Sequence, residues 1–137
     1  MILIDTNVVL ALMNHNDPLY TVAAASTPAM RREGIVLVWP VFAELTHFFR
    51  RGDVYGKFEK LCTILNLRME PSEHLIEQLD VLHWLKQYAT HRPDYADVHL
   101  VLLTAKLKHA KIWTFDSEFR TIWRRPDGSP VPLAIKG

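Results

Sequence analysis

The 137-residue sequence has very little cysteine: Cys62 is the single one. One cysteine excludes an internal disulfide and a metal site built from cysteines, and it is compatible with a reducing compartment. No run of about 18 apolar residues occurs, so we expect no membrane-spanning helix. No signal peptide is visible, because Asp5 interrupts the N-terminal apolar run after four residues. These absences predict a cytoplasmic protein.

An excess of charge of one sign is also lacking. The 16 lysines and arginines nearly balance the 15 acidic residues, which leaves a formal net charge of +1. The global charge therefore neither favours nor excludes a nucleic-acid partner, and any basic surface has to be local. Hydrophobic residues make up 49% and charged residues 23%, which is typical of a folded globular protein. Since no repeat or linker interrupts the chain, we expect a single domain over residues 1–137.

Continuous apolar runs, rather than alternating ones, indicate strands that are buried on both faces, as in a parallel sheet. Such runs occupy residues 1–4, 35–39 and 111–115. Weaker candidates are residues 67–70 and an edge strand at residues 131–135. Helical patterns separate these runs, and the alternation predicts an α/β fold with a mainly parallel sheet.

Local signals predict where several helices begin. We expect Thr6 or Asn7 to cap the first helix and Ser72 to cap a long later one. Pro28 should kink or restart the helix in which it lies. The segment 95–109 is apolar nearly all round, which predicts a helix packed in the core against the sheet.

Acidic residues recur at the same kind of position in this pattern. Asp5 directly follows the first strand, and Glu44 lies in the first turn of the helix after the second strand. Asp97 lies in the first turn of the buried helix, three residues after Asp94, and Asp116 follows the next strand. Because the carboxyl ends of parallel strands lie along one edge of a sheet, these side chains can meet in one cleft.

Taken singly, most of these acids have a structural explanation. Asp94 and Asp97 can be an N-cap and a third-position acid, and Asp116 can cap the next helix. Asp5 is harder to explain, because a carboxylate at the end of a buried strand loses hydration. A cluster of such acids needs a cation or protons to offset the repulsion between like charges. Asp5→Asn would remove one repelling charge, so a metal ligand there should lose activity without losing stability.

Hard divalent cations meet that need. Mg²⁺ or Mn²⁺ takes oxygen ligands, keeps several waters and bridges carboxylates to phosphate oxygens. Zinc is disfavoured because the seven histidines are scattered and form no ligand pattern with cysteine. An acidic cluster with such a cation suits hydrolysis of a phosphodiester, since the cation lowers the pKa of water and stabilises charge on the transferring phosphoryl group.

At these positions the chain resembles the PIN-domain ribonucleases, and most closely the VapC-like toxins of bacterial and archaeal toxin–antitoxin pairs. The matching pieces occur in the family's order and cover nearly the whole chain. They are Ile4-Asp5-Thr6-Asn7, Ala43-Glu44-Leu45, Asp94-Tyr95-Ala96-Asp97 and Thr114-Phe115-Asp116-Ser117-Glu118-Phe119.

The resemblance implies a three-layer α/β/α domain with a five-stranded parallel sheet and Mg²⁺- or Mn²⁺-dependent endonuclease activity on RNA. Asp5, Glu44 and Asp97 match the three main metal-site acids of the family, and Asp116 matches the fourth. Asp94 matches an acid that only some members have, so it is a possible metal ligand or a helix cap. Polar residues that orient the acids or the metal's waters would be Thr6, Asn7 and Thr114.

The resemblance also implies partners. A toxin would have a cognate antitoxin that covers the acidic cleft. A homodimer through the helices between residues 42 and 65 is expected from their surplus of aromatic side chains, namely Phe48, Phe49, Tyr55 and Phe58. Local basic side chains would hold RNA phosphates without reading sequence. The candidates are Arg50, Arg51, Arg120, Arg124 and Arg125, with Arg31, Arg32 and Lys57 as further ones.

Three other functional hypotheses stand beside that of a toxin. A phosphatase of the haloacid-dehalogenase type needs a second aspartate where this chain has Asn7, and it has no place for Glu44. A PIN scaffold can also bind RNA or protein without cleaving it, or act as a solitary nuclease in RNA processing. The sequence leaves open which RNA is the target, and whether one or two metal ions act.

Overall fold

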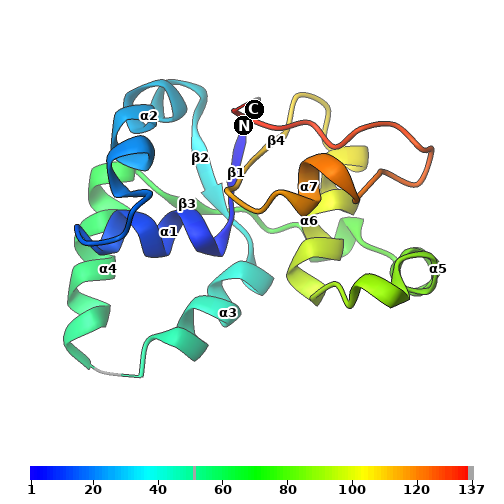
Figure 1. Ribbon diagram of the computed structural model, residues 1–137, viewed down its shortest axis with the longest axis horizontal. Helices are drawn as coiled ribbons and strands as arrows, with labels where there is room; N and C mark the ends of the chain where they lie inside the picture. The colour runs from blue at the N-terminus through cyan, green and yellow to red at the C-terminus, as the bar shows by residue number, and fades with distance from the viewer. Residues whose placement is uncertain (51, 136–137) are drawn as a thin grey trace.

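A parallel sheet lies at the centre of the computed structural model, which describes residues 1–50 and 52–135 (Figure 1). Its strands pair in the order β3-β2-β1-β4. Their bounds are β1 (Ile2–Ile4), β2 (Ile35–Leu37), β3 (Arg68–Met69) and β4 (Lys111–Trp113). All three neighbouring pairs run parallel, with β1 between β2 and β4. The predicted parallel α/β architecture is therefore confirmed.

The predicted count of five strands is wrong by one within the described residues. The expected edge strand at residues 131–135 makes a single isolated bridge, in which Leu133 pairs with Ile112. Ile112 donates its N–H to Pro132 at 2.9 Å, and Ala134 donates its N–H to Ile112 at 2.9 Å. Two prolines, Pro130 and Pro132, remove backbone donors from this segment, which limits how far it can pair.

Helices cover both faces of the sheet, which gives the predicted three layers (Figure 1). On one side are α1 (Thr6–Met13), α2 (Tyr20–Glu33) and α4 (Gly52–Leu65). On the other side are α5 (Gln78–Gln87), α6 (Tyr95–Lys106) and α7 (Glu118–Thr121), with short 3₁₀ turns at Glu73–Leu75 and Ala89–His91. The remaining helix, α3 (Trp39–Phe48), follows β2 and contacts both α1 and α6. Of the helices described, none combines the length and the apolar character needed to cross a membrane.

The core lies where the strands meet α6. Every residue of β1 and β2 is buried, and α6 buries Ala96 together with residues 98–104. The apolar character of this helix on all sides therefore reflects burial on nearly all sides, as predicted. Burial of α6 matters for function because its first turn, which carries Asp97, is held by the core behind it.

Two helix starts differ from the local prediction. The cap of α1 is Asp5, whose side chain accepts the N–H of Thr6, so the helix begins before the expected cap residues. Ser72 caps no long helix; it is fully buried, and its Oγ lies 2.8 Å from Nε2 of His99. Because the hydroxyl of Ser72 pairs with the buried ring of His99, it does not cap a helix. The helix α5 begins only at Gln78.

Pro28 lies inside α2, which runs from Tyr20 to Glu33, so the helix does not restart there. A kink at Pro28 stays a prediction. The side chain of Pro28 is exposed, so the loss of one backbone donor falls on the outer side of the helix.

Candidate active site

A hollow of about 220 Å³ at the carboxyl edge of the sheet brings together acids from separate segments of the chain. We call it the acidic pocket. Its carboxylates come from the end of β1, from α3, from the start of α6 and from the segment after β4. They are Asp5, Glu44, Asp94, Asp97, Asp116 and Glu118. All five acids singled out in the sequence thus line one pocket, and Glu118 joins them.

Asp5 is held by donors from both sides. Its Oδ1 accepts the N–H of Thr6 at 2.8 Å, as the cap of α1. Its Oδ2 accepts the hydroxyl of Thr114 at 2.7 Å and the side-chain amide of Asn7 at 3.2 Å. The carboxylate is 5% exposed, so these bonds replace most of its lost hydration.

The same network positions Asp116. Oγ1 of Thr114 also accepts the backbone N–H of Asp116 at 3.0 Å and the side-chain amide of Asn7 at 3.1 Å. Asn7 in turn accepts the N–H of Phe115 at 2.9 Å through its Oδ1. Thr114 and Asn7 therefore occupy the orienting positions that the sequence assigned to them. Thr6 contributes its backbone N–H, while its buried hydroxyl has no hydrogen-bond partner among the described residues.

Asp97 is held from its own helix. Its Oδ2 accepts the backbone N–H of Asp94 at 3.1 Å, and the two residues form a capping box at the start of α6. Asp97 is half-buried, whereas Asp94 is exposed at the rim. Asp94 is therefore the cap of α6, and whether it also binds a metal ion stays a prediction.

Burial and mutual repulsion raise the pKa of two of these acids. Burial raises the pKa of Asp5 to about 6, against the lowering effect of its hydrogen bonds, and the charges of Glu44 and Asp116 add to the rise. Burial likewise raises the pKa of Asp97 to about 7, with further contributions from Asp5, Asp94 and Asp116. The acids are thus close enough to repel one another, and the metal-free site tends to hold protons near neutral pH.

The donor set fits a hard divalent cation. Every acid of the pocket offers carboxylate oxygens, which Mg²⁺ and Mn²⁺ prefer, and a cation would relieve the repulsion that raises these pKa values. Among the described residues, no three His, Cys, Asp or Glu side chains are arranged to hold an ion directly. Mg²⁺ keeps several of its waters, so carboxylates spaced around a pocket can bind it partly through those waters.

Sequence reasoning missed Arg92, the one basic side chain among those that line the acidic pocket. Its backbone is left-handed, with φ of 49°, at the end of the 3₁₀ turn Ala89–His91. Non-glycine residues adopt this conformation rarely. In the sequence, Arg92 lies two residues before Asp94, and its positive charge was the only signal of a role near the acids. The fold shows that it lines their pocket.

The basic residues singled out in the sequence lie elsewhere. Arg50, Arg120, Arg124 and Arg125 do not line the acidic pocket, and Arg51 lies outside the described residues. Some of them bind within the chain: the Nη1 of Arg124 donates to the carbonyl of Trp123 at 2.9 Å, and the Nε of Arg125 donates to Ser129 at 2.8 Å. Their role toward RNA stays a prediction.

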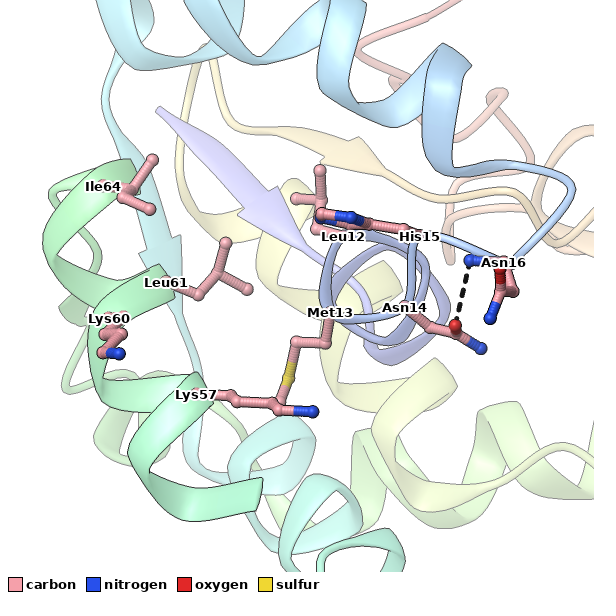
Figure 2. A pocket seen from close by; sticks show the side chains of 9 residues that line it. All are labelled: Leu12, Met13, Asn14, His15, Asn16, Lys57, Lys60, Leu61 and Ile64. Atoms are coloured by element: carbon pink, nitrogen blue, oxygen red, sulfur yellow. Dashed lines mark hydrogen bonds between the residues drawn. The ribbon is translucent and has the colours of Figure 1, made fainter. Parts of the chain in front are cut away.

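A separate hollow lies between the end of α1 and α4 (Figure 2). Leu12 and Met13 face Leu61 and Ile64 across it, while Lys57 and other polar side chains complete the lining. No carboxylate lines this hollow, which has a volume of about 440 Å³. Lys57, proposed from the sequence as an RNA contact, therefore lies here and not on the acidic pocket.

Comparison with known families and proteins gives one finding for this architecture. A family model described as the PIN domain matches residues 2–123, which include all six acids of the pocket. In the comparison with curated proteins, none matches the chain.

The raised pKa of Asp97 predicts a pH dependence of stability in metal-free protein. A carboxyl whose pKa is higher in the folded state stabilises the fold below its ordinary pKa of 3.8, and this contribution is lost as pH rises through about 7. Asp97→Asn keeps an oxygen to accept the Asp94 N–H and removes the charge. Relative to the variant, the unaltered protein should therefore lose roughly 1–3 kcal/mol of unfolding free energy between pH 4 and pH 8, allowing for partial solvent screening.

Urea unfolding in EDTA across this pH range measures the difference. Asp80→Asn, on α5 outside the acidic pocket, is the matched control and should follow the unaltered protein. Identical pH dependence in the Asp97→Asn variant would contradict the prediction. Asp5→Asn is the less clean test, because it also places an amide group against the donors of Thr114 and Asn7.

Proposed function

The chain belongs to the PIN-domain family, and on that premise we propose that it is a cytoplasmic, Mg²⁺- or Mn²⁺-dependent endoribonuclease that hydrolyses RNA phosphodiester bonds. PIN domains have a nuclease-type fold, usually with metal-dependent RNA cleavage. One observation carries the proposal beyond the family: acids from four separate segments line one pocket, and two of them have raised pKa values. Asp5, Asp94 and Asp97 also cap helices, but capping does not explain why the acids gather in one pocket, where their mutual repulsion opposes folding.

In this mechanism five of the six acids have a task. Asp5, Asp97 and Asp116 would hold the cation, and the Thr114 network keeps the first and third of them oriented. A cation held there would lower the pKa of water and stabilise negative charge at phosphorus. Glu44, half-buried on α3, binds through water or accepts the proton of the attacking water. Asp94, at the exposed rim, is an additional ligand in this scheme.

Arg92 supplies the positive charge that the acids lack. Its side chain lines the acidic pocket yet makes no hydrogen bond or ion pair with any described residue. A guanidinium left free beside six carboxylates is available for an anionic ligand. We assign it to a phosphate oxygen of the RNA strand, which it can bind through two parallel N–H groups. This contact positions the backbone and reads no sequence.

The finer proposal is that the protein is the toxin of a toxin–antitoxin pair. It is supported by the set of motifs that resembles VapC-like toxins, from Asp5 through Glu44 and Asp97 to Asp116. The antitoxin would block RNA from the acidic pocket. A solitary nuclease of RNA processing is the alternative.

A homodimer is part of the same proposal, with a smaller surface than the sequence suggested. Phe49 and Phe58 are 4% and 7% exposed and pack in the core, so they are not surplus. On α4, Tyr55 remains 43% exposed. The exposed side of α4 around Tyr55 is the candidate contact between copies, which light scattering of the purified protein measures.

We expect purified protein, free of any inhibitor, to cleave RNA when Mg²⁺ or Mn²⁺ is present and to stop when EDTA is added. Asp5→Asn and Asp97→Asn should each lower the cleavage rate by about 100-fold or more, because each removes a charged ligand of the cation. Gel analysis of a broad RNA panel measures this, with Asp80→Asn as the control. A protein that binds RNA yet leaves the panel intact with both metals would instead be a non-cleaving PIN scaffold.

Arg92→Ala should raise KM for RNA on the order of tenfold while changing kcat less, because a phosphate contact away from the reacting atoms is lost. Arg92→Lys should keep part of the affinity, since the charge remains but the two-pronged geometry is gone. Arg68→Ala, on β3 and outside the acidic pocket, serves as the control for a loss of one exposed positive charge. An unchanged KM in Arg92→Ala would remove Arg92 from the substrate site.

Expression of the intact gene alone should arrest cell growth, and the Asp97→Asn variant should not. Co-expression of a small open reading frame beside the gene should restore growth if it encodes the antitoxin. Normal growth with the active enzyme, and no such neighbouring frame, would favour a nuclease of RNA processing. Growth curves and sequencing of the RNA ends decide between the two.

A further inference from the structure

A second hollow, of about 570 Å³, borders the acidic pocket between α3 and the start of α6. We call it the aromatic hollow. It shares Glu44, Phe48 and Asp94 with the acidic pocket, so the two hollows adjoin each other. The other lining residues are Pro40, Ala43, His47, Tyr95 and Ala96. Its lining therefore changes from carboxylates on one side to apolar and aromatic side chains on the other.

Two aromatic rings of this hollow are open to solvent. Phe48, at the end of α3, is 56% exposed, and Tyr95, at the start of α6, is 49% exposed. Large apolar side chains gathered at the rim of a pocket mark a binding surface more often than an accident of packing. Both rings lie beside carboxylates of the acidic pocket, Phe48 with Glu44 and Tyr95 with Asp94.

Tyr95 is fixed from behind by a buried polar pair. Its hydroxyl lies 3.3 Å from Nδ1 of His99, and the two rings meet edge to face at 5.7 Å. Nε2 of His99 is 2.8 Å from the hydroxyl of Ser72. His99 is 1% exposed and Ser72 is fully buried, so this pair cannot meet a ligand itself. Its effect is to hold the ring of Tyr95 at the hollow in one orientation, which lowers the entropy lost when a ligand binds.

We propose that the aromatic hollow binds one unstacked nucleobase of the RNA strand whose backbone lies in the acidic pocket. The base packs against Phe48 and Tyr95, while His47 and the rim carboxylates offer hydrogen bonds to its edge. Proteins that read RNA bind splayed bases in this way, on aromatic side chains with a few polar groups. The hollow thereby sets a base preference next to the cleaved bond. This inference rests on the proposed ribonuclease function.

The shared lining favours a base over a second copy of the chain. Any protein surface that covered Phe48 would also lie over Glu44 and Asp94, and so would close the acidic pocket to RNA. A nucleotide can occupy both hollows at once, because its phosphate and its base are joined and need adjacent sites of different chemistry. An acidic pocket that holds a cation and an aromatic hollow beside it provide those two sites.

The first test is cleavage of single-stranded RNAs that differ only in one base beside the cleaved bond. Phe48→Ala should raise KM on the order of tenfold for the preferred RNA and should flatten the base preference, with a smaller effect on kcat. Phe48→Trp should retain the preference, because it keeps an aromatic ring. Phe48→Leu should lose it although it stays apolar, which separates stacking from simple burial. Leu79→Ala, an exposed large apolar residue on α5 and outside the hollow, is the control.

The second test measures stacking directly. Single-stranded RNA that carries 2-aminopurine beside the cleaved bond is titrated into the Asp97→Asn variant with Mg²⁺ present, so that cleavage is slow. Stacking on Phe48 and Tyr95 should quench the fluorescence of the probe, and Phe48→Ala in the same background should remove most of the quenching. Tyr95→Phe, which keeps the ring but loses the bond to His99, should quench with weaker binding.

The outcomes separate the inference from the proposed function. If the unaltered protein cleaves no RNA, the proposed function fails. If it cleaves RNA and Phe48→Ala keeps the same KM, base preference and quenching, the inference alone is overturned. A change from dimer to monomer in Phe48→Ala, with base preference unchanged, would assign the hollow to contact between copies and would also overturn it. Circular dichroism confirms the folding of each variant.

Discussion

The hydrogen bond from the Thr114 hydroxyl to Asp5, 2.7 Å long, joins the ends of two neighbouring strands, and the acidic pocket is built around it. Parallel pairing places Ile4 of β1 opposite Trp113 of β4, so the residues that follow both strands emerge side by side. Thr114 then accepts the backbone N–H of Asp116, which sets the position of the second acid relative to the first. One hydroxyl thus connects strand pairing to the arrangement of charge in the site.

That arrangement is electrostatically unfavourable without a positive ligand. Three donors compensate Asp5, yet its burial still outweighs them and raises its pKa to about 6. Asp97 lies near enough to Asp5 for the two charges to raise its pKa further. A cation that bound here would displace protons from these acids, and some fold stability is lost in keeping them together. Arg92 lines the same pocket and makes no hydrogen bond or ion pair through its side chain with any described residue.

Much of the fold and of the site was predictable because both follow from local pattern and one rule of topology. Continuous apolar runs predicted three of the four strands, and residues 67–70 were a weaker candidate for the fourth. The alternation with helices predicted that the strands are parallel. Carboxyl ends of parallel strands share an edge, which predicted that Asp5, Glu44 and Asp116 would meet. Two predictions were wrong for different physical reasons. Pro130 and Pro132 lack backbone donors, which reduces the expected fifth strand to one bridge. The hydroxyl of Ser72 pairs with His99 and does not cap a helix.

The parallel α/β architecture and the placement of the acids at strand ends follow from the order of the residues, because hydrophobic period and strand ends are properties of neighbours along the chain. Which side chains complete the site depends on how the whole chain packs. Arg92 enters the acidic pocket through a left-handed turn, and Tyr95 is oriented by His99 and Ser72, whose positions in the chain are 27 residues apart. Such contacts depend on how distant segments pack, and the raised pKa of Asp5 depends on the same packing, since burial is its largest cause.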